Sequence, residues 1–271
     1  MNKFRFPAFP LYYVLLVVLL YLPIGVLFLF SVNNGIVFSF PLKGITDHWY
    51  RDMVKNGELV AALRNSVAVA ISSSLAATAL GTAAAIALAR FEFKGKAVFL
   101  TIALMPLLVP FLILGVALLI LFAALQIDRS LVTVAIAHTV VSLPYTLLIL
   151  MARLVGFDPK LEEAAQDLGA TYPYTLGRVI LPLIAPAMLA AWLLAFTVSF
   201  DEFVLASFLN SGKPTLPVYI FGQLRFANRF PQVVALAVLV MVLSIILFLI
   251  SGWLQQLGSR AALEQRLGRG E

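Results

Sequence analysis

Two adjacent carboxylates, Asp201 and Glu202, lie within an otherwise apolar run and are the strongest candidates for binding chemistry. A charged side chain costs about 2.5–3.5 kcal/mol at the centre of a membrane helix, so both acids should face a cavity or a partner. Aromatic and hydroxyl side chains recur around them at helical spacing, namely Trp192, Phe196, Thr197, Ser199 and Phe203. Carboxylates beside aromatic rings favour an organic cation. The alternative is that the acids cap a broken helix or pair with basic groups of a second chain.

Few other side chains could support catalysis. The sequence has no cysteine and only two histidines, His48 and His138, which are far apart. We therefore predict neither a metal site nor catalytic residues, which argues against a membrane-embedded enzyme. His138 is expected to hydrogen-bond between helices, with proton handling as the alternative. No phosphate-binding loop of the G-x-x-x-x-G-K-[ST] type is found, because Gly95-Lys96 is followed by Ala97.

The composition is that of an integral membrane protein. Of the 271 residues, 62% are hydrophobic and 12% are charged, and the mean hydropathy is +1.01. Water-soluble domains are roughly one quarter charged, so a soluble globule, a disordered chain and a disulfide-stapled secreted domain are excluded. The net charge of +6 is best explained by cytoplasmic loops beside anionic lipid, and no nucleic-acid partner is predicted.

Six apolar stretches are long enough to cross a bilayer as helices, which takes about 20 residues each. They run over residues 11–30, 66–89, 97–125, 131–154, 183–209 and 233–253. Strands are excluded because these runs are continuously apolar rather than alternating. We therefore predict an all-α fold, with one transmembrane domain over residues 1–271. The first span is expected to be an uncleaved anchor, because it is too long for a signal-peptide core.

Basic residues beside the spans predict the orientation. An even number of spans puts both termini on one side, and Lys and Arg are more numerous there than on the other side. The short turn from Arg90 to Lys96, with three positive charges, is the clearest case. Because basic loops remain in the cytoplasm, we expect both termini to be cytoplasmic.

Two further patterns concern how the spans pack. Small residues recur at every fourth position of the second span, at Ser73, Ala77, Gly81, Ala85 and Ala89. Such a stripe lets helix backbones approach closely in lipid, so we expect a buried helix contact there. Prolines should kink the third and fourth spans, at Pro106, Pro110 and Pro144. Kinks would suit a gated pathway, although membrane helices also tolerate proline widely.

The segment 155–182, between the fourth and fifth spans, interrupts the apolar pattern with a short helix. Asp158 precedes a proline, which is typical of a helix start, and two glutamates follow near the positive end of the helix. Gly169 is expected to end this helix, and Thr171 to cap a second one. A structured helix outside the spans indicates a docking element for a soluble partner.

The same segment resembles the EAA loop of importer-type ABC permeases. The matching residues are Glu163-Ala164-Ala165, Gly169 and Leu181-Pro182. Three residues separate Ala165 from Gly169. Nine more residues lead from Gly169 to an aliphatic residue, which lies two positions before Leu181. Val179 stands where that family usually has isoleucine. The resemblance covers essentially the whole chain and implies the type I importer fold. The alternative is an amphipathic helix that lies on the membrane surface.

This resemblance implies that the chain is one subunit of a complex in a bacterial inner membrane. The loop would form a coupling helix in a groove of a cytoplasmic ATPase dimer. Its coupling residues would be Glu163, Ala164, Ala165, Gly169, Leu181 and Pro182. The ATPase would bind ATP and Mg²⁺, with no cofactor in this chain, and a paralogous permease and an extracytoplasmic solute-binding protein would complete the complex. The competing class is a self-contained transporter or channel that uses Asp201 and Glu202 as ion sites, but no convincing internal repeat is present.

The solute is predicted from a narrower resemblance. The Ser-Phe-Asp-Glu-Phe run over 199–203, and Thr215-Leu-Pro-Val-Tyr-Ile with a later Arg225-Phe, are similar to the second permease of spermidine/putrescine importers. A polyamine is the implied solute. The predicted pathway residues are Trp192, Phe196, Thr197, Ser199, Asp201 and Glu202. Polyamine permeases often have an acid after a proline where this chain has Phe111, so an opine or amino-acid-like amine is the alternative.

Overall fold

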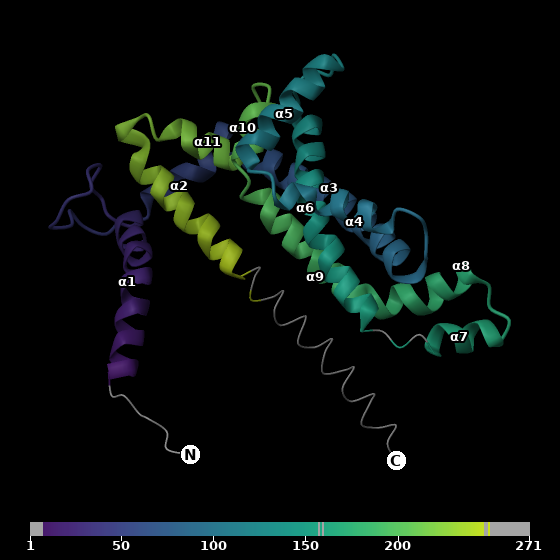
Figure 1. Ribbon diagram of the computed structural model, residues 1–271. Coiled ribbons are helices and arrows are strands. Elements are labelled where there is room, and N and C mark those ends of the chain that lie inside the picture. The colour runs from purple at the N-terminus through teal and green to yellow at the C-terminus, as the bar shows by residue number, and fades with distance from the viewer. Residues whose placement is uncertain (1–7, 157, 159, 247–248, 250–271) are drawn as a thin grey trace. The chain divides into compact units, whose positions relative to one another are not determined.

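The computed structural model describes residues 8–156, 158, 160–246 and 249 (Figure 1). Its contacts divide the chain into two compact units. Unit 1 comprises residues 1–60 and 220–244, and unit 2 comprises residues 61–219 and 245–271. Within the described residues the regular elements are helices, apart from one isolated bridge between Asn33 and Ile45. The predicted all-α fold is therefore confirmed.

Unit 1 begins with a long apolar helix that has little cover from the rest of that unit. Its elements are α1 (Ala8–Ser31), α2 (His48–Lys55), the start of α3, η3 (Ala227–Arg229) and most of a helix over Phe230–Ile246. Leu11 on α1 is 70% exposed, which is typical of an apolar helix that faces lipid. The loop after α1 is held by Trp49 Nε1, which donates to the Asn33 carbonyl oxygen at 2.8 Å. The rings of Phe30 and Phe38 stack there, with centroids 4.6 Å apart.

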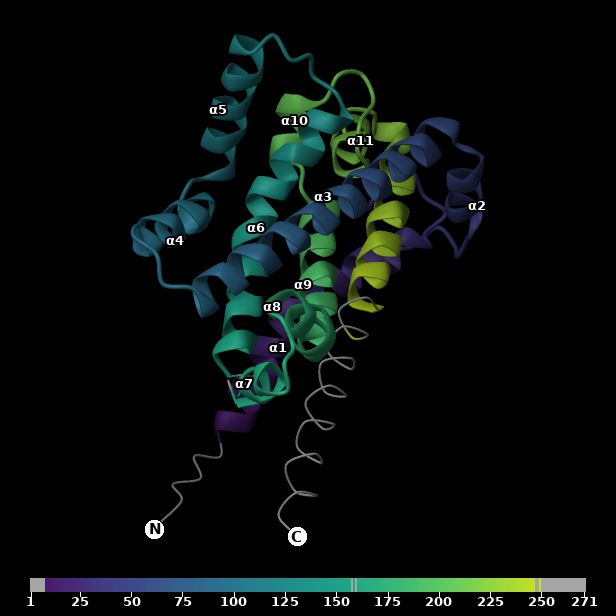
Figure 2. The same ribbon diagram turned by 90° about the vertical axis from the view of Figure 1, so that its right-hand side faces the viewer.

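Unit 2 is built around the packing of α6 against α9. Its elements are the remainder of α3 (Gly57–Arg90), α4 (Lys96–Leu104), η1 (Met105–Leu107), α5 (Phe111–Ala124), α6 (Leu131–Val155), α7 (Lys160–Asp167), α8 (Tyr172–Thr175), η2 (Leu176–Ile180), α9 (Leu181–Phe200), α10 (Val204–Leu209) and most of α11 (Leu216–Gln223). Hydrogen bonds join α3 to both α6 and α9. Figures 1 and 2 show α7 and α8 at one end of these helices, and α5 and α10 at the other.

The small-residue stripe of α3 packs against α6, as predicted. Ser73, Ala77 and Ala85 are fully buried. The Thr146 hydroxyl donates to the Ala77 carbonyl oxygen at 2.9 Å. A Cβ atom on Gly81 would collide with the Thr146 side chain, so the close approach of the two helices requires glycine at that position.

Among the described residues, four helices are long and apolar enough to cross a membrane, over Leu11–Ser31, Gly57–Arg90, Leu131–Val155 and Tyr172–Phe200. A fifth span is present if the bent pair Lys96–Leu107 and Phe111–Ala124 counts as one. For the predicted sixth span, the structure describes the helix over Phe230–Ile246. The rest of that prediction, up to residue 253, lies almost entirely outside the described residues.

Two of the predicted spans are broken. The third bends by 107° between Leu107 and Phe111. This bend confirms the kinks expected at Pro106 and Pro110. Its physical cause is that proline lacks the N–H that a continuing helix needs. The helix expected over 183–209 ends at Phe200 and resumes at Val204. In contrast, α6 runs through Pro144 as one helix.

Candidate functional site

The helix predicted in the loop is α7, and the residues that bound it are those indicated by the sequence. The Asp158 carboxylate accepts a hydrogen bond from the Lys160 backbone N–H at 3.1 Å, which caps the first turn. Gly169 has a φ of +87°, a left-handed conformation that other residues rarely adopt. The Ala170 N–H donates to the Ala165 carbonyl oxygen at 3.0 Å, which satisfies the end of the helix.

The two glutamates of α7 have opposite environments. Glu163, the motif acid, is exposed, as is Ala164. Glu162 is only 7% exposed and forms an ion pair with Arg90, the last residue of α3. The Arg90 Nη2 and Nε atoms lie 2.6 and 2.7 Å from Glu162 Oε1. The sequence does not reveal this pair, because its members are 72 residues apart. Taken alone, Arg90 is explained as part of a basic turn beside a span, and Glu162 as an acid near the start of a helix.

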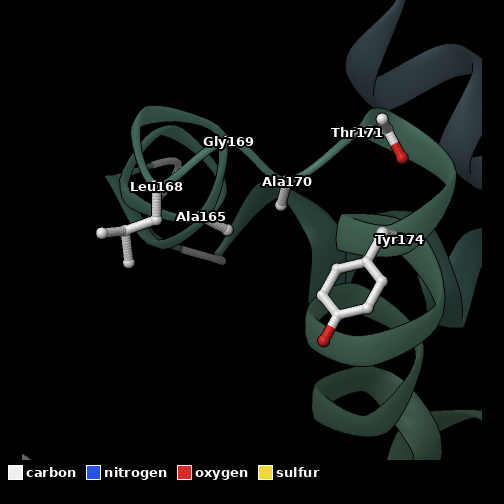
Figure 3. Close-up of a pocket in the computed structure, with 6 residues that line it drawn as sticks. All are labelled: Ala165, Leu168, Gly169, Ala170, Thr171 and Tyr174. Atoms are coloured by element: carbon white, nitrogen blue, oxygen red, sulfur yellow. The ribbon is translucent and has the colours of Figure 1, made fainter.

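A concave pocket of about 550 Å³ lies between α7 and the start of α8 (Figure 3). Its lining residues are Ala165, Leu168, Gly169, Ala170, Thr171 and Tyr174. Leu168 is 90% exposed and Tyr174 is 60% exposed. Leu168 follows the polar helix α7, and Tyr174 lies at the start of the apolar run over Tyr172–Phe200. Large side chains exposed together at the end of a span are typical of a surface that another protein covers.

The second half of the loop leads into α9. Thr171 precedes α8 as predicted, although its side chain makes no capping hydrogen bond. The π-helical turn η2 follows and ends at Ile180, which is fully buried. Leu181 packs against the buried hydrophobic cluster that contains Ile180, whereas Pro182 is exposed. The Leu-Pro end of the motif therefore begins in the core, while Glu163 at its other end is at the surface.

The two acids of the predicted pathway also have opposite environments. Asp201 directly follows α9 and is exposed, whereas Glu202 is 6% exposed. The Glu202 carboxylate accepts hydrogen bonds from the backbone N–H groups of Leu205 at 3.0 Å and Ala206 at 3.1 Å. It therefore caps α10, the role that sequence analysis left as an alternative. Its Oε2 atom also lies 3.2 Å from Nε2 of His138 on α6.

A buried polar cluster joins α3, α6 and α9 beside this break. His138 is 1% exposed, and its Nδ1 atom hydrogen-bonds with the Ser199 hydroxyl at 2.7 Å. The Ser73 hydroxyl donates to Ser199 at 2.8 Å. The interhelical hydrogen bonding expected of His138 is thus confirmed. Thr197 donates to a carbonyl oxygen of its own helix at 2.9 Å.

A row of aromatic rings follows α9 up to Asp201. The ring centroids of Trp192 and Phe196 are 6.0 Å apart, and Phe196 and Phe200 stack at 5.8 Å. The sequence suggested Phe203 as the last ring of this row. Because α9 ends at Phe200, that residue is the last ring instead, although it was not among the predicted residues. The four-residue spacing from Trp192 was the signal that could have identified it.

Metal-binding side chains are not grouped in the described part of the chain. No three His, Asp or Glu side chains there lie close enough to hold a metal ion. His48 in unit 1 hydrogen-bonds with the Thr46 hydroxyl at 2.8 Å, and His138 in unit 2 binds Ser199.

Comparison with known proteins places the chain. The family described as "Binding-protein-dependent transport system inner membrane component" matches residues 77–257. The chain belongs to this family. The permease is 36% identical over 233 residues to the spermidine/putrescine transport system permease protein PotC of Haemophilus influenzae, covering 86% of this chain and 90% of PotC. It is also 36% identical over 230 residues to the putrescine transport system permease protein PotI of Escherichia coli, covering 82% and 81% of the two chains.

A solved structure has the same fold. A chain of a bacterial alginate ABC transporter, in complex with an alginate pentasaccharide-bound periplasmic protein, matches with a TM-score of 0.68 at 16% identity. The match covers 94% of this permease and 96% of that chain. The fold is therefore that of an ABC importer permease, and the protein is a multi-pass membrane component of a transport system.

Proposed function

We propose that this permease is the translocation subunit of an ATP-driven importer for a polyamine such as putrescine or spermidine. The observation that carries the proposal is the 36% identity to PotC over 86% of the chain. PotI, a permease named for putrescine, matches at the same level. Because this chain has no phosphate-binding loop of the usual type, ATP and Mg²⁺ would bind a partner ATPase.

Asp201 is the acid that we propose for the cationic solute. Glu202 is engaged by two backbone N–H groups and lies beside His138. The Asp201 carboxylate, in contrast, makes no hydrogen bond or ion pair with another described residue and is exposed. The row from Trp192 to Phe200 ends beside it. Ring faces and a carboxylate together attract an ammonium group, which a polyamine carries at each end.

A solute with hydrogen-bond acceptors is the second candidate. Trp192 Nε1 is buried and has no acceptor among the described residues. A fully protonated polyamine offers only donors, whereas an opine or amino-acid-like amine has a carboxylate that would accept from this N–H. The apolar Phe111 after Pro110 also fits a solute with fewer positive charges.

The ATPase is proposed to dock on α7 and the pocket beside it. Glu163 and Ala164 are exposed there, and so is Leu168, whose burial would contribute about 2 kcal/mol. A short capped helix suits a groove on a partner protein. Closure of two ATPase subunits would then move α7 and switch the permease between inward and outward access.

The remaining partners belong to the same proposal. A paralogous permease would supply the second half of the pathway, and an extracytoplasmic binding protein would deliver the solute, in keeping with the family description. Both termini would lie in the cytoplasm of a bacterium. The contact between Arg90 and α7 supports this orientation, because it puts the basic turn after α3 on the side of the docking loop.

Uptake of labelled putrescine into proteoliposomes tests the proposal. With the ATPase, second permease and binding protein present, we expect uptake that requires ATP. Asp201→Asn should lower it about tenfold or more, because a charge-assisted contact contributes about 1.5–3 kcal/mol. Asp128→Asn, which removes an equal charge from an exposed loop, is the matched control and should have no effect.

Three results would count against the proposal. Uptake without ATP would contradict the importer function. Normal uptake by an assembled Asp201→Asn variant would contradict the cation site. Uptake of an opine but not putrescine would favour the second candidate.

A further inference from the structure

The Arg90–Glu162 ion pair joins the docking loop to a membrane span that contains none of the motif residues. Both side chains are mostly buried, with 16% of Arg90 and 10% of Glu162 exposed. Two guanidinium nitrogens approach the same carboxylate oxygen, at 2.6 and 2.7 Å. Removing Glu162 would take the carboxylate partner from a mostly buried guanidinium, and removing Arg90 would take the cation from a mostly buried carboxylate, so this contact is costly to break.

The end of α3 contacts both helices of the loop. Arg90 reaches α7 through Glu162, and its Nη1 atom lies 3.5 Å from the Leu154 carbonyl oxygen near the end of α6. The next residue, Phe91, packs its ring edge-on against Tyr172 at the start of α8, with centroids 5.5 Å apart. A cation at the carboxyl end of α3 is also favoured by the helix dipole. The end of α3 thus holds the loop at two points.

The helix α7 cannot act as a rigid lever without such contacts. It has eight residues, and isolated helices of this length are unstable in water. Its packing neighbours in the loop are α8 and η2. The ion pair adds a charged connection from α7 to the far larger α3, which has 34 residues.

We infer that Arg90 and Glu162 are a positioning pair, which transmits the movement of α7 to α3 and is separate from the surface that binds the ATPase. The inference rests on the proposed docking of an ATPase on α7. With the pair intact, α7 and the end of α3 move together. Without it, α7 follows the ATPase while α3 lags behind, so that ATP is hydrolysed with less solute moved.

The first test measures putrescine moved per ATP hydrolysed by the complete importer in proteoliposomes. Glu162→Gln and Arg90→Gln should each keep the ATPase bound and hydrolysis close to normal, while the ratio falls about fivefold. The double variant should be no worse than either single one, because all three remove the same interaction. Glu92→Gln is the matched control, since it breaks an exposed ion pair with Lys96 at 2.8 Å on the turn after α3. It should leave the ratio unchanged.

The second test does not depend on the solute. Because the chain has no cysteine, the substitutions Lys94→Cys and Gln166→Cys create the only two sites for thiol-reactive spin labels in this subunit. Both positions are exposed, one after α3 and the other on α7. With the ATPase bound, we expect a narrow distribution of label distances. The same measurement in Glu162→Gln should give a broad one.

The outcomes separate this inference from the proposals beneath it. A normal ratio and a narrow distribution in Glu162→Gln would overturn it. Loss of the ATPase from Glu162→Gln would also overturn it, because the pair would then be a docking contact. An unaltered permease that retains no ATPase would overturn the docking proposal and this inference with it. An importer that carries no putrescine would contradict only the polyamine proposal, and the label distances would still test the role of the Arg90–Glu162 pair.

Discussion

The docking loop and the helix break lie at opposite ends of α9, which has 20 residues and is therefore about 30 Å long. Each contains two adjacent acids. In the loop, Glu162 is buried and Glu163 is exposed, whereas at the break Asp201 is exposed and Glu202 is buried. In both places one acid is used within the protein and the other is exposed, and we propose that the exposed acids bind a partner or a solute.

The two buried acids differ in what they bind. Glu162 pairs with Arg90, a permanent cation on another helix. Glu202 accepts hydrogen bonds from two N–H groups of α10, the helix that it caps, and also contacts a histidine. The first contact connects two elements that could otherwise move separately. The second fixes a local backbone shape, so we expect the loop to transmit movement and the break to hold its geometry.

The largest effect should come from Glu202→Ala. This change leaves two helix-end N–H groups without their acceptor and removes the carboxylate beside buried His138, so it should lower the free energy of unfolding by about 3 kcal/mol. Unfolding in detergent, followed by circular dichroism, measures it. Asp201→Ala is the control and should stay within about 0.5 kcal/mol of the original. Equal losses from the two changes would contradict the division of roles at the break.

A smaller and more local effect is expected from Glu162→Gln. Without the ion pair, α7 should open more often, and trypsin should cleave after exposed Lys160 about tenfold faster. Gel analysis of timed digests of the purified permease gives the rate. The neighbouring change Glu163→Gln should leave it near the original value, because that side chain is exposed. Faster cleavage in both variants would show that the pair does not hold the loop.

The smallest effect should follow Ser199→Ala. The Ser199 hydroxyl bonds with His138 and Ser73, and its loss should cost about 1 kcal/mol of unfolding free energy. Ser207→Ala removes an exposed hydroxyl that bonds only within its own helix, so it serves as the control and should be near neutral. A loss as large as that of Glu202→Ala would mean that the hydroxyl cluster, rather than the cap, holds the break.

Features set by neighbouring residues were predictable from the sequence. The cap at Asp158 before α7 and the left-handed Gly169 after it depend on groups within one turn of the helix. The contact of the small-residue stripe around Gly81 follows from a spacing of four along a single helix. The prolines likewise indicated a bend in the third span.

Features set by distant residues were not predictable. Nothing local distinguishes Glu162 from Glu163, because the burial of Glu162 depends on Arg90, 72 residues away. The break between Phe200 and Val204 was only an alternative at the level of the sequence, because apolar residues on both sides dominate the average hydropathy of the run. A proline indicates a kink but not its size, so the 107° bend of the third span also needed the structure.

The central claim is that α7 receives an ATPase through its exposed acid, and purification in mild detergent from the native membrane tests it most directly. We expect a stoichiometric ATPase to accompany the permease and to be lost on Glu163→Lys, because charge reversal should reduce its affinity about a hundredfold. We expect the ATPase to be retained in Asp128→Lys, which makes the same charge change in the exposed loop before α6. A permease that is recovered alone, and that moves putrescine into liposomes without ATP, would contradict it.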